Sequence, residues 1–140
     1  MKAKKAPRVC VGVLVYNKKG EILLGRSHKW RNRWVVFGGG LEYGETFEAC
    51  AKREVKEETG LTVSTIRFVD MQEAVFPKKY HKKQHFVFVD FSAKATSKKV
   101  KLNDEAQAYA WVSPRAALRM NLGPPTRLFI RRYMEKLKKR

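Results

Sequence analysis

The sequence predicts an α/β sandwich with a mixed central β-sheet. Three observations predict this class: a pair of strands near the N-terminus, one long helix that lies between strands, and a helix at the C-terminal end. The length of 140 residues suits one compact domain with a sizeable core. We therefore expect a single domain over residues 1–140.

The first strands form a hairpin. Val9–Tyr16 is an apolar, β-branched run that predicts a largely buried strand, and Glu21–Gly25 predicts the returning strand after a turn at residues 17–20. Trp34–Phe37 predicts another short strand. It leads into a glycine-rich turn at residues 37–40.

A basic segment with two tryptophans, SHKWRNRW, separates the second and third of these strands. The cations in and just before it are Arg26, His28, Lys29, Arg31 and Arg33. Arginine suits bidentate recognition of phosphate, and an aromatic ring can stack on a base. A solvated basic loop that buries only its last tryptophan explains the same residues equally well, so both interpretations stay open.

The long helix is expected over residues 46–59. Thr46 or Glu45 opens it, and Gly60 is the residue type that accepts the left-handed backbone at a helix end. At about 100° per residue, Phe47, Ala51 and Val55 share one half-turn. That half-turn is the face expected to pack on the domain.

Three carboxylates of this helix predict a metal site. Glu54, Glu57 and Glu58 have i, i+3, i+4 spacing and lie beside the packing face, where unpaired negative charge is unfavourable. A solvated acidic face is the simpler alternative, but it would place the cluster away from the apolar residues. Oxygen ligands favour Mg²⁺, or Mn²⁺ in its place, and the lack of Cys or His in the cluster disfavours zinc.

Several strands and then a short helix are expected after the long helix. Leu61–Val75 predicts one or two strands and Gln84–Ala95 a clear one, joined by a basic tip at residues 77–83. Residues 99–112 predict a short strand, a polar loop that holds Glu105, and another strand. A short helix is expected over Pro114–Met120.

The final helix is expected from Pro125 to about residue 140, because proline is favoured in a first helical turn. Its apolar stripe is formed by Leu128, Phe129, Tyr133 and Leu137. The other face and the tail are basic and include Arg140.

The composition departs from that of an ordinary globular protein in its charge, a net +18. Such a charge attracts polyanions, which include nucleotides, nucleic acids and anionic membrane surfaces. The apolar run at Val9–Tyr16 is too short to span a membrane, so we expect a cytoplasmic protein without a membrane partner. Cys10 and Cys50 are expected to be reduced core residues.

Residues 39–61 resemble the Nudix box, Gly-x5-Glu-x7-Arg-Glu-U-x-Glu-Glu-x-Gly-U, in which U is a bulky aliphatic residue. The specified positions are all filled, by Gly39, Glu45, Arg53, Glu54, Val55, Glu57, Glu58, Gly60 and Leu61. The resemblance implies the Nudix fold, an α/β/α sandwich. It also implies a hydrolase that cleaves a nucleoside diphosphate linked to another group, with Mg²⁺ held by this helix.

The resemblance also implies roles for single residues. The carbonyl oxygen of Gly39 and the carboxylates of Glu54, Glu57 and Glu58 would bind the metal, with Glu105 as a further ligand or as the base. Glu45 and Arg53 would brace the site. Substrate contacts are expected from Arg26, Gly38, Gly39, Gly40 and Asn121.

Three functions remain open. The C-terminal half, with VKLNDEAQAYAWVSPRAAL and NLGPPTR, resembles the NudI-like nucleoside triphosphatases, which implies cleavage of (deoxy)nucleoside triphosphates to a monophosphate and pyrophosphate. Pro77 stands where ADP-ribose pyrophosphatases of the superfamily often carry proline, which favours ADP-ribose or another nucleotide sugar. The third is a nucleic-acid-binding module that retains the box. A monomer and a homodimer are both compatible with the sequence.

Overall fold

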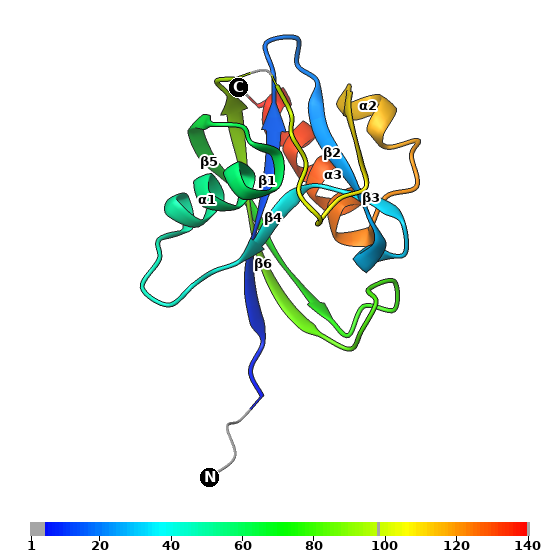
Figure 1. Cartoon of the computed structure of the whole chain (residues 1–140). Coiled ribbons are helices and arrows are strands. Elements are labelled where there is room, and N and C mark those ends of the chain that lie inside the picture. The colour runs from blue at the N-terminus through cyan, green and yellow to red at the C-terminus, as the bar shows by residue number, and fades with distance from the viewer. Residues whose placement is uncertain (1–4, 98, 140) are drawn as a thin grey trace.

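The computed structural model of the protein describes residues 5–97 and 99–139 and has the mixed α/β architecture that the sequence predicts (Figure 1). The basic residues Lys2, Lys4 and Arg140 lie outside the described part. The strands are β1 Arg8–Tyr16, β2 Ile22–Ser27, β3 Arg33–Val35, β4 Phe37–Gly40, β5 Val63–Val75, β6 His85–Ala95 and β7 Ala108–Val112. The helices are α1 Phe47–Thr59, α2 Pro114–Ala117 and α3 Pro124–Lys138, with a short 3₁₀ helix, η1, at His28–Trp30.

The sheet has the order β3-β2-β1-β6-β5, with β4 paired to β1 and β7 paired to β2. β1 and β6 run parallel along the whole of β1, whereas the other pairs are antiparallel. The prediction of a mixed sheet is therefore confirmed. β1 lies at the point where the sheet branches towards β2 at one end and towards β4 at the other.

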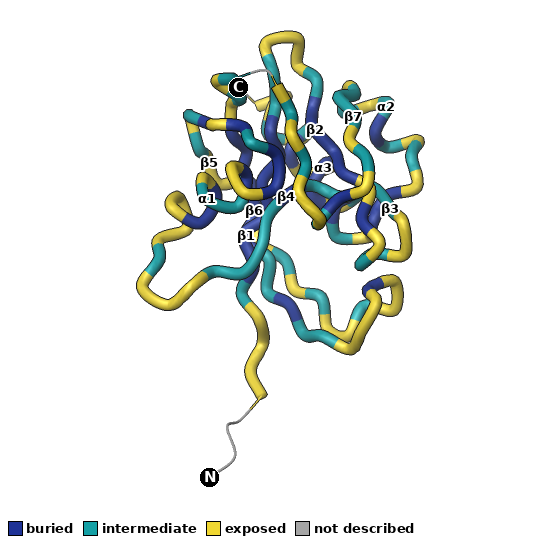
Figure 2. The backbone as a smooth tube through the Cα atoms, in the orientation of Figure 1, coloured by how far each residue is buried: buried dark blue, intermediate teal, exposed yellow. Residues whose placement is uncertain are grey.

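Two apolar clusters cover the two faces of the sheet. Most of β1 and β2, at its centre, is buried (Figure 2). Successive residues of β1 point to opposite faces, as in any strand. Val11, Val13 and Val15 therefore pack with α1, and Leu14 packs with Phe129 of α3. The two helices enclose the sheet from both sides. Among the described residues, no helix is long and apolar enough to cross a membrane.

The segment predicted as one strand at Trp34–Phe37 is two strands, and that prediction is wrong in its detail. The chain changes partner at Val36: β3 pairs with β2, and β4 pairs with β1. The backbone N–H of Val36 donates to Thr126 Oγ1 at 3.1 Å, outside either ladder. The glycines expected in a turn therefore lie in β4.

Two other predicted elements differ from the structure. The described residues 99–107 form no strand; instead the backbone N–H groups of Lys101 and Asn103 donate to Thr59 and Glu58 of α1. The first hairpin is antiparallel, but β1 and β2 share a single register pair, Tyr16 with Ile22. Most of β1 pairs with β6 and β4.

The final helix begins at Pro124, one residue earlier than predicted, and its buried stripe differs. Phe129 and Tyr133 are buried as expected, together with Ile130, whereas Leu128 and Leu137 are exposed. The helix lies against the sheet along one narrow face, and the two leucines are on its flanks.

Candidate active site

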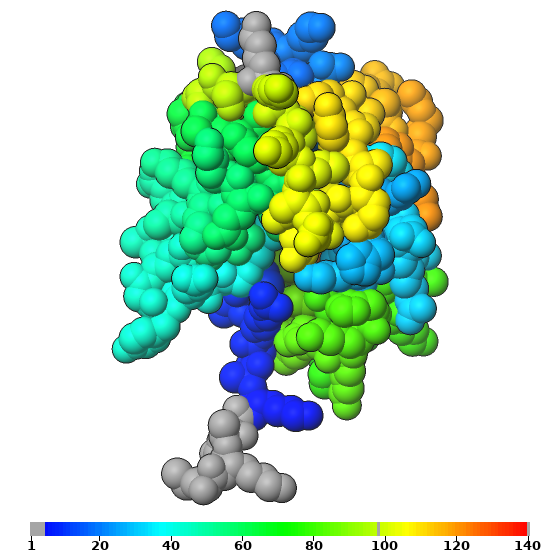
Figure 3. Space-filling model, in the orientation of Figure 1, coloured from blue at the N-terminus to red at the C-terminus, as the bar shows by residue number. Residues whose placement is uncertain are grey.

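A cavity of about 290 Å³ lies where α1, β4, the loop at residues 103–106, η1 and the β5–β6 hairpin meet. Figure 3 shows the face of the molecule on which these segments come together. The cavity is lined by acidic residues on the α1 side, by aromatic residues of η1 and the hairpin, and by polar residues on the α3 side. Its lining thus combines segments that are far apart in the sequence.

The ends of α1 set the orientation of its carboxylates. Thr46 is the N-cap and its side chain accepts from the N–H of Ala49 at 3.1 Å. Gly60 ends the helix with φ of 75° and donates its N–H to Lys56 O at 3.0 Å. Both ends agree with the sequence prediction.

Glu54, Glu57 and Glu58 all line the cavity. Glu58 is 6% exposed, and its Oε2 accepts from the backbone N–H of Gly38 at 3.0 Å. Glu54 lies against Gly39, where an added Cβ would come within 2.4 Å of its carboxyl group. Glu57 is the outermost of the three, with 54% of its side chain exposed.

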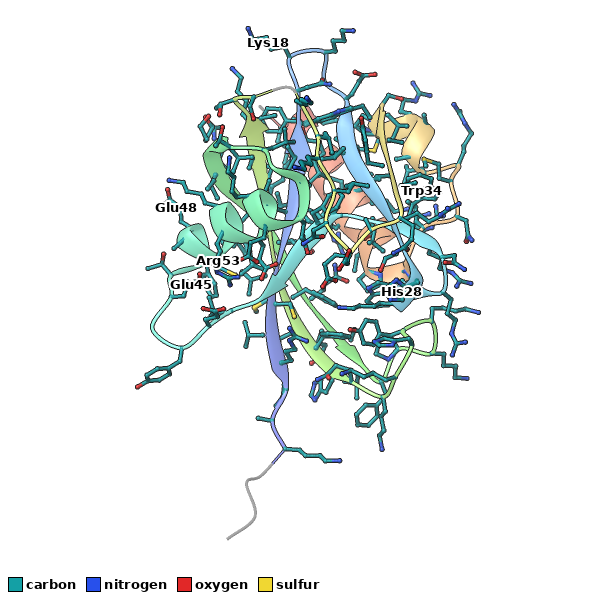
Figure 4. All side chains as sticks on the ribbon, viewed as in Figure 1. Lys18, His28, Trp34, Glu45, Glu48 and Arg53 are labelled. Carbon is teal, nitrogen blue, oxygen red and sulfur yellow. The ribbon has the colours of Figure 1, made fainter. Side chains whose placement is uncertain are left out.

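Arg53 points towards Glu45, which lies in the loop before α1 (Figure 4). Two donors reach Glu45, at 2.7 and 2.9 Å, and a third nitrogen reaches Glu54 at 2.9 Å. The same guanidinium donates to Gly40 O at 3.2 Å. The bond from Arg53 lowers the pKa of Glu45 to about 2.

Burial raises the pKa of Glu58 to about 9. The donated N–H of Gly38 lowers this pKa, and the neighbouring charges of Glu54, Glu105 and Glu57 raise it. Burial also raises the pKa of Glu54, against the opposing bond from Arg53. The carboxylates thus disfavour one another's charge inside the cavity.

This donor set fits a hard divalent cation. Carboxylate and carbonyl oxygens are the ligands that Mg²⁺ and Mn²⁺ prefer, and a cation would offset the mutual repulsion seen in the pKa shifts. In the part of the chain that the structure describes, no three His, Cys, Asp or Glu side chains converge closely enough to hold an ion as they stand. Arg53 and the Gly38 N–H engage carboxylate oxygens there instead.

Glu105 also lines the cavity, facing it from the 103–106 loop. Its Oε2 accepts from Lys29 Nζ at 2.9 Å. Lys29 and Arg8 both line the cavity as well, and the guanidinium of Arg8 lies beside Gly40, where an added Cβ would come within 2.8 Å of its Nη2. Two cations therefore border the acidic side.

Two residues predicted to contact substrate do not line the cavity. Arg26 is exposed on β2, whose neighbouring residues Gly25 and Ser27 do line it, because alternate residues of a strand point to opposite faces. Asn121 is exposed, and its carbonyl oxygen accepts from the N–H of Trp34. By contrast, Gly38, Gly39 and Gly40 all line the cavity.

Three polar residues on the α3 side line the cavity: Gln72, Asp90 and Thr126. Thr126 is a candidate base contact on the sequence alone, together with Asn121, whereas Gln72 and Asp90 are not predicted from it. Asp90 carried a signal, because it is the one charged residue within the otherwise apolar run Phe86–Phe91. Gln72, in the middle of a strand with irregular alternation, carried none.

The chain and its fold match known proteins. A sequence model described as the NUDIX domain matches residues 6–133. The nucleoside triphosphatase NudI of Escherichia coli (strain K12) is 30% identical over 105 residues, which cover 71% of this chain and 74% of that relative. The structure of the MutT protein from Methanosarcina mazei Go1 has a TM-score of 0.78 at 26% identity, covering 98% of this chain and 99% of that one. The NUDIX domain of Shewanella oneidensis NrtR, complexed with ADP ribose, has a TM-score of 0.80 at 18% identity, covering 96% and 90%.

Proposed function

This chain belongs to the NUDIX family and is a hydrolase of phosphoanhydride bonds, and from that premise we propose that its substrate is a nucleoside triphosphate. The products would be the nucleoside monophosphate and pyrophosphate. The relative that is 30% identical is a nucleoside triphosphatase, which supports this substrate class. The cavity volume, about 290 Å³, is at the small end of the range for ligand sites.

The residues that would hold Mg²⁺ are the carboxylates of Glu54, Glu57 and Glu58 and the carbonyl oxygen of Gly39, with Glu105 as a further ligand. Mg²⁺ bound there would neutralise polyphosphate charge and lower the pKa of a water molecule beside it. Glu57 has the most exposed side chain of the three, so it is the carboxylate most free to rotate towards the ion.

The chain's own groups would position the phosphates and take the proton. Lys29 and Arg8 line the cavity and would donate charge-assisted hydrogen bonds to phosphate oxygens. Glu54 or Glu105 would accept the proton of the attacking water. Glu54 suits this role because burial raises its pKa, and a base is most effective when its pKa lies near the working pH.

The observation that carries the proposal is the gathering of Glu54, Glu57, Glu58 and Glu105 around one cavity with Gly39. A panel of nucleoside triphosphates, nucleoside diphosphates and ADP-ribose, incubated with Mg²⁺ in ¹⁸O-labelled water, tests it. We expect a triphosphate to give monophosphate and pyrophosphate, with the label in one of these two products. Faster hydrolysis of ADP-ribose than of any triphosphate would replace the substrate with a nucleotide sugar. Salt-sensitive binding of RNA or DNA without any turnover would replace the enzyme with a nucleic-acid-binding module.

A further inference from the structure

The α3 side of the cavity holds a carboxyl group that the phosphate chemistry does not use. Asp90 lies in the middle of β6, is 2% exposed and lines the cavity. A carboxyl group that is this deeply buried is unfavourable as an anion unless it is paired or bound. Its hydrogen bonds show which of its oxygens is engaged by the protein.

Gln72 engages one oxygen of Asp90. Its Nε2 donates to Asp90 Oδ2 at 3.0 Å and to the backbone carbonyl oxygen of Pro125 at 2.9 Å. A carbonyl oxygen can only accept, so the amide nitrogen of Gln72 must face Pro125, and this determines the orientation of the amide. Asp90 Oδ2 is therefore an acceptor, and a proton on the carboxyl group resides on Oδ1.

Oδ1 lies over Gly12, the register partner of Asp90 on β1. A Cβ at residue 12 would come within 2.5 Å of Oδ1, so the glycine makes room for the carboxyl group. Among the described residues, every side-chain oxygen that is fully buried has a hydrogen-bond partner. Oδ1 has none, so it is not fully buried. Oδ1 is therefore reachable from the cavity.

The surroundings of Asp90 favour its neutral form. Burial raises the pKa of Asp90 to about 7, the bond from Gln72 lowers it, and the charge of Asp70 on β5 raises it. Asp70 is itself paired with Arg132 of α3 at 3.4 Å. Two cations lie on the neighbouring elements and are engaged elsewhere: Arg8 of β1 lies beside Gly40, and Arg127 in the first turn of α3 donates to the carbonyl oxygens of Leu118 and Met120.

We propose that Asp90 selects the nucleobase of the substrate, by donating a hydrogen bond from Oδ1 to a carbonyl oxygen or an unprotonated ring nitrogen of the base. The proposal rests on the nucleotide function proposed above, because it places the base on the α3 side of a cavity whose α1 side takes the phosphates. Gln72 is the positioning residue that holds the carboxyl group in register with the base.

Two substitutions separate this role from a structural one. Asp90→Asn keeps an oxygen that accepts from Gln72 and puts an amide nitrogen in place of Oδ1. That nitrogen donates a hydrogen bond at every pH. Asp90→Leu removes both atoms at similar volume. Glu73→Gln is the matched control, since it removes an exposed carboxylate from the same sheet.

The measurement is calorimetric binding of four nucleoside monophosphates, which differ only in their base, with EDTA present and at about pH 6 and about pH 8.5. Between about pH 6 and about pH 8.5, we expect the affinity of the unsubstituted protein for its preferred base to fall by roughly 30-fold more than the affinity of Asp90→Asn falls. The reason is that about 3% of a group with a pKa near 7 stays protonated at the higher pH. Comparison with the Asn variant removes the effect of phosphate titration. Asp90→Leu should bind all four bases within about threefold of one another, and Glu73→Gln should match the unsubstituted protein.

The proposal is wrong if Asp90→Asn and the unsubstituted protein show the same pH dependence, or if Asp90→Leu keeps the base preference. It is equally wrong if no monophosphate binds at millimolar concentration. Should Asp90→Leu fail to fold, the pH comparison with Asp90→Asn decides alone. Intact pH-dependent binding without triphosphate hydrolysis would reject the proposed reaction and leave the base contact standing.

Discussion

Arg53 and Glu45 form a two-point ion pair, with Nε to Oε2 at 2.7 Å and Nη2 to Oε1 at 2.9 Å. This fork geometry is the strongest arrangement of a guanidinium and a carboxylate. Because Arg53 also bonds Gly40 O and Glu54, it connects β4, the loop before α1 and one cavity carboxylate. The pair holds the acidic side of the cavity in shape without lining it.

The first prediction concerns this pair. Glu45→Gln should lower the melting temperature at pH 6 by about 3–5 °C, the effect of losing one charge-assisted bond in a domain of this size. The pKa of Glu45 is lowered to about 2, so its stabilising contribution is present above its ordinary value of 4.5 and is lost as the pH falls towards 2. The difference in melting temperature between variant and unsubstituted protein should therefore shrink between pH 6 and pH 3. A constant difference would show that the pair is not ionic.

Glu57→Gln and Glu58→Gln should each lower kcat by about a hundredfold or more. This is a larger loss than the one expected from removing a residue that only hydrogen-bonds a metal ligand. Each keeps the size of the side chain and removes the negative oxygen that a cation needs. Far-ultraviolet circular dichroism should show an unchanged fold. Near wild-type rates in both variants at saturating Mg²⁺ would contradict the metal assignment.

Gly39→Ala should separate the fold from the metal site. Its Cβ would meet the end of the Glu54 side chain at 2.4 Å, and this flexible end can move while the backbone stays. We expect a melting temperature within a few degrees of the unsubstituted protein and a loss of most of the stabilisation by Mg²⁺. Gly20→Ala is the matched control: it strains a left-handed glycine with φ of 79°, meets nothing within 4 Å, and should leave the Mg²⁺ response intact.

Glu58 should make the metal-free protein less stable as the pH rises. Its pKa is raised from 4.5 to about 9 on folding, so the folded state binds more protons than the unfolded state between these values, and stability falls across that window. In Glu58→Gln the fall between pH 5 and pH 9 should be smaller, as measured by urea unfolding with EDTA present. Added Mg²⁺ should stabilise the unsubstituted protein more at pH 8 than at pH 6, because protons compete for the carboxylate. Parallel pH profiles for the two proteins would contradict the raised pKa.

The helix at the centre of the site was predictable from the sequence because its signals are local. Thr46 and Gly60 mark its ends within the chain itself, and the spacing of the glutamates follows from the helical repeat. The break at Val36 was not predictable, because it depends on which strands β3 and β4 pair with. Strand partners are set by residues far away in the sequence.

In the candidate site, too, the features set by local sequence were predictable and those set by distant parts of the chain were not. Predicting Arg26 as a phosphate contact followed the resemblance, whereas the alternation of β2 turns Arg26 away and η1 brings Lys29 to the cavity. Asp90 and Gln72 meet across β6 and β5, a pairing with a register shift that no local pattern reveals. Gly39 and Glu105 could be placed beside the α1 carboxylates only through the resemblance, whereas nothing local in the sequence joins Asp90 to Gln72.

The most direct test of the metal site is a crystal of the protein soaked in Mn²⁺, with the ion located by its anomalous scattering. We expect a peak in the cavity within about 2.5 Å of carboxylate oxygens of Glu54, Glu57 and Glu58 and of the Gly39 carbonyl oxygen. A cavity without a peak, in which these side chains point apart or pair only with lysine and arginine, would contradict it.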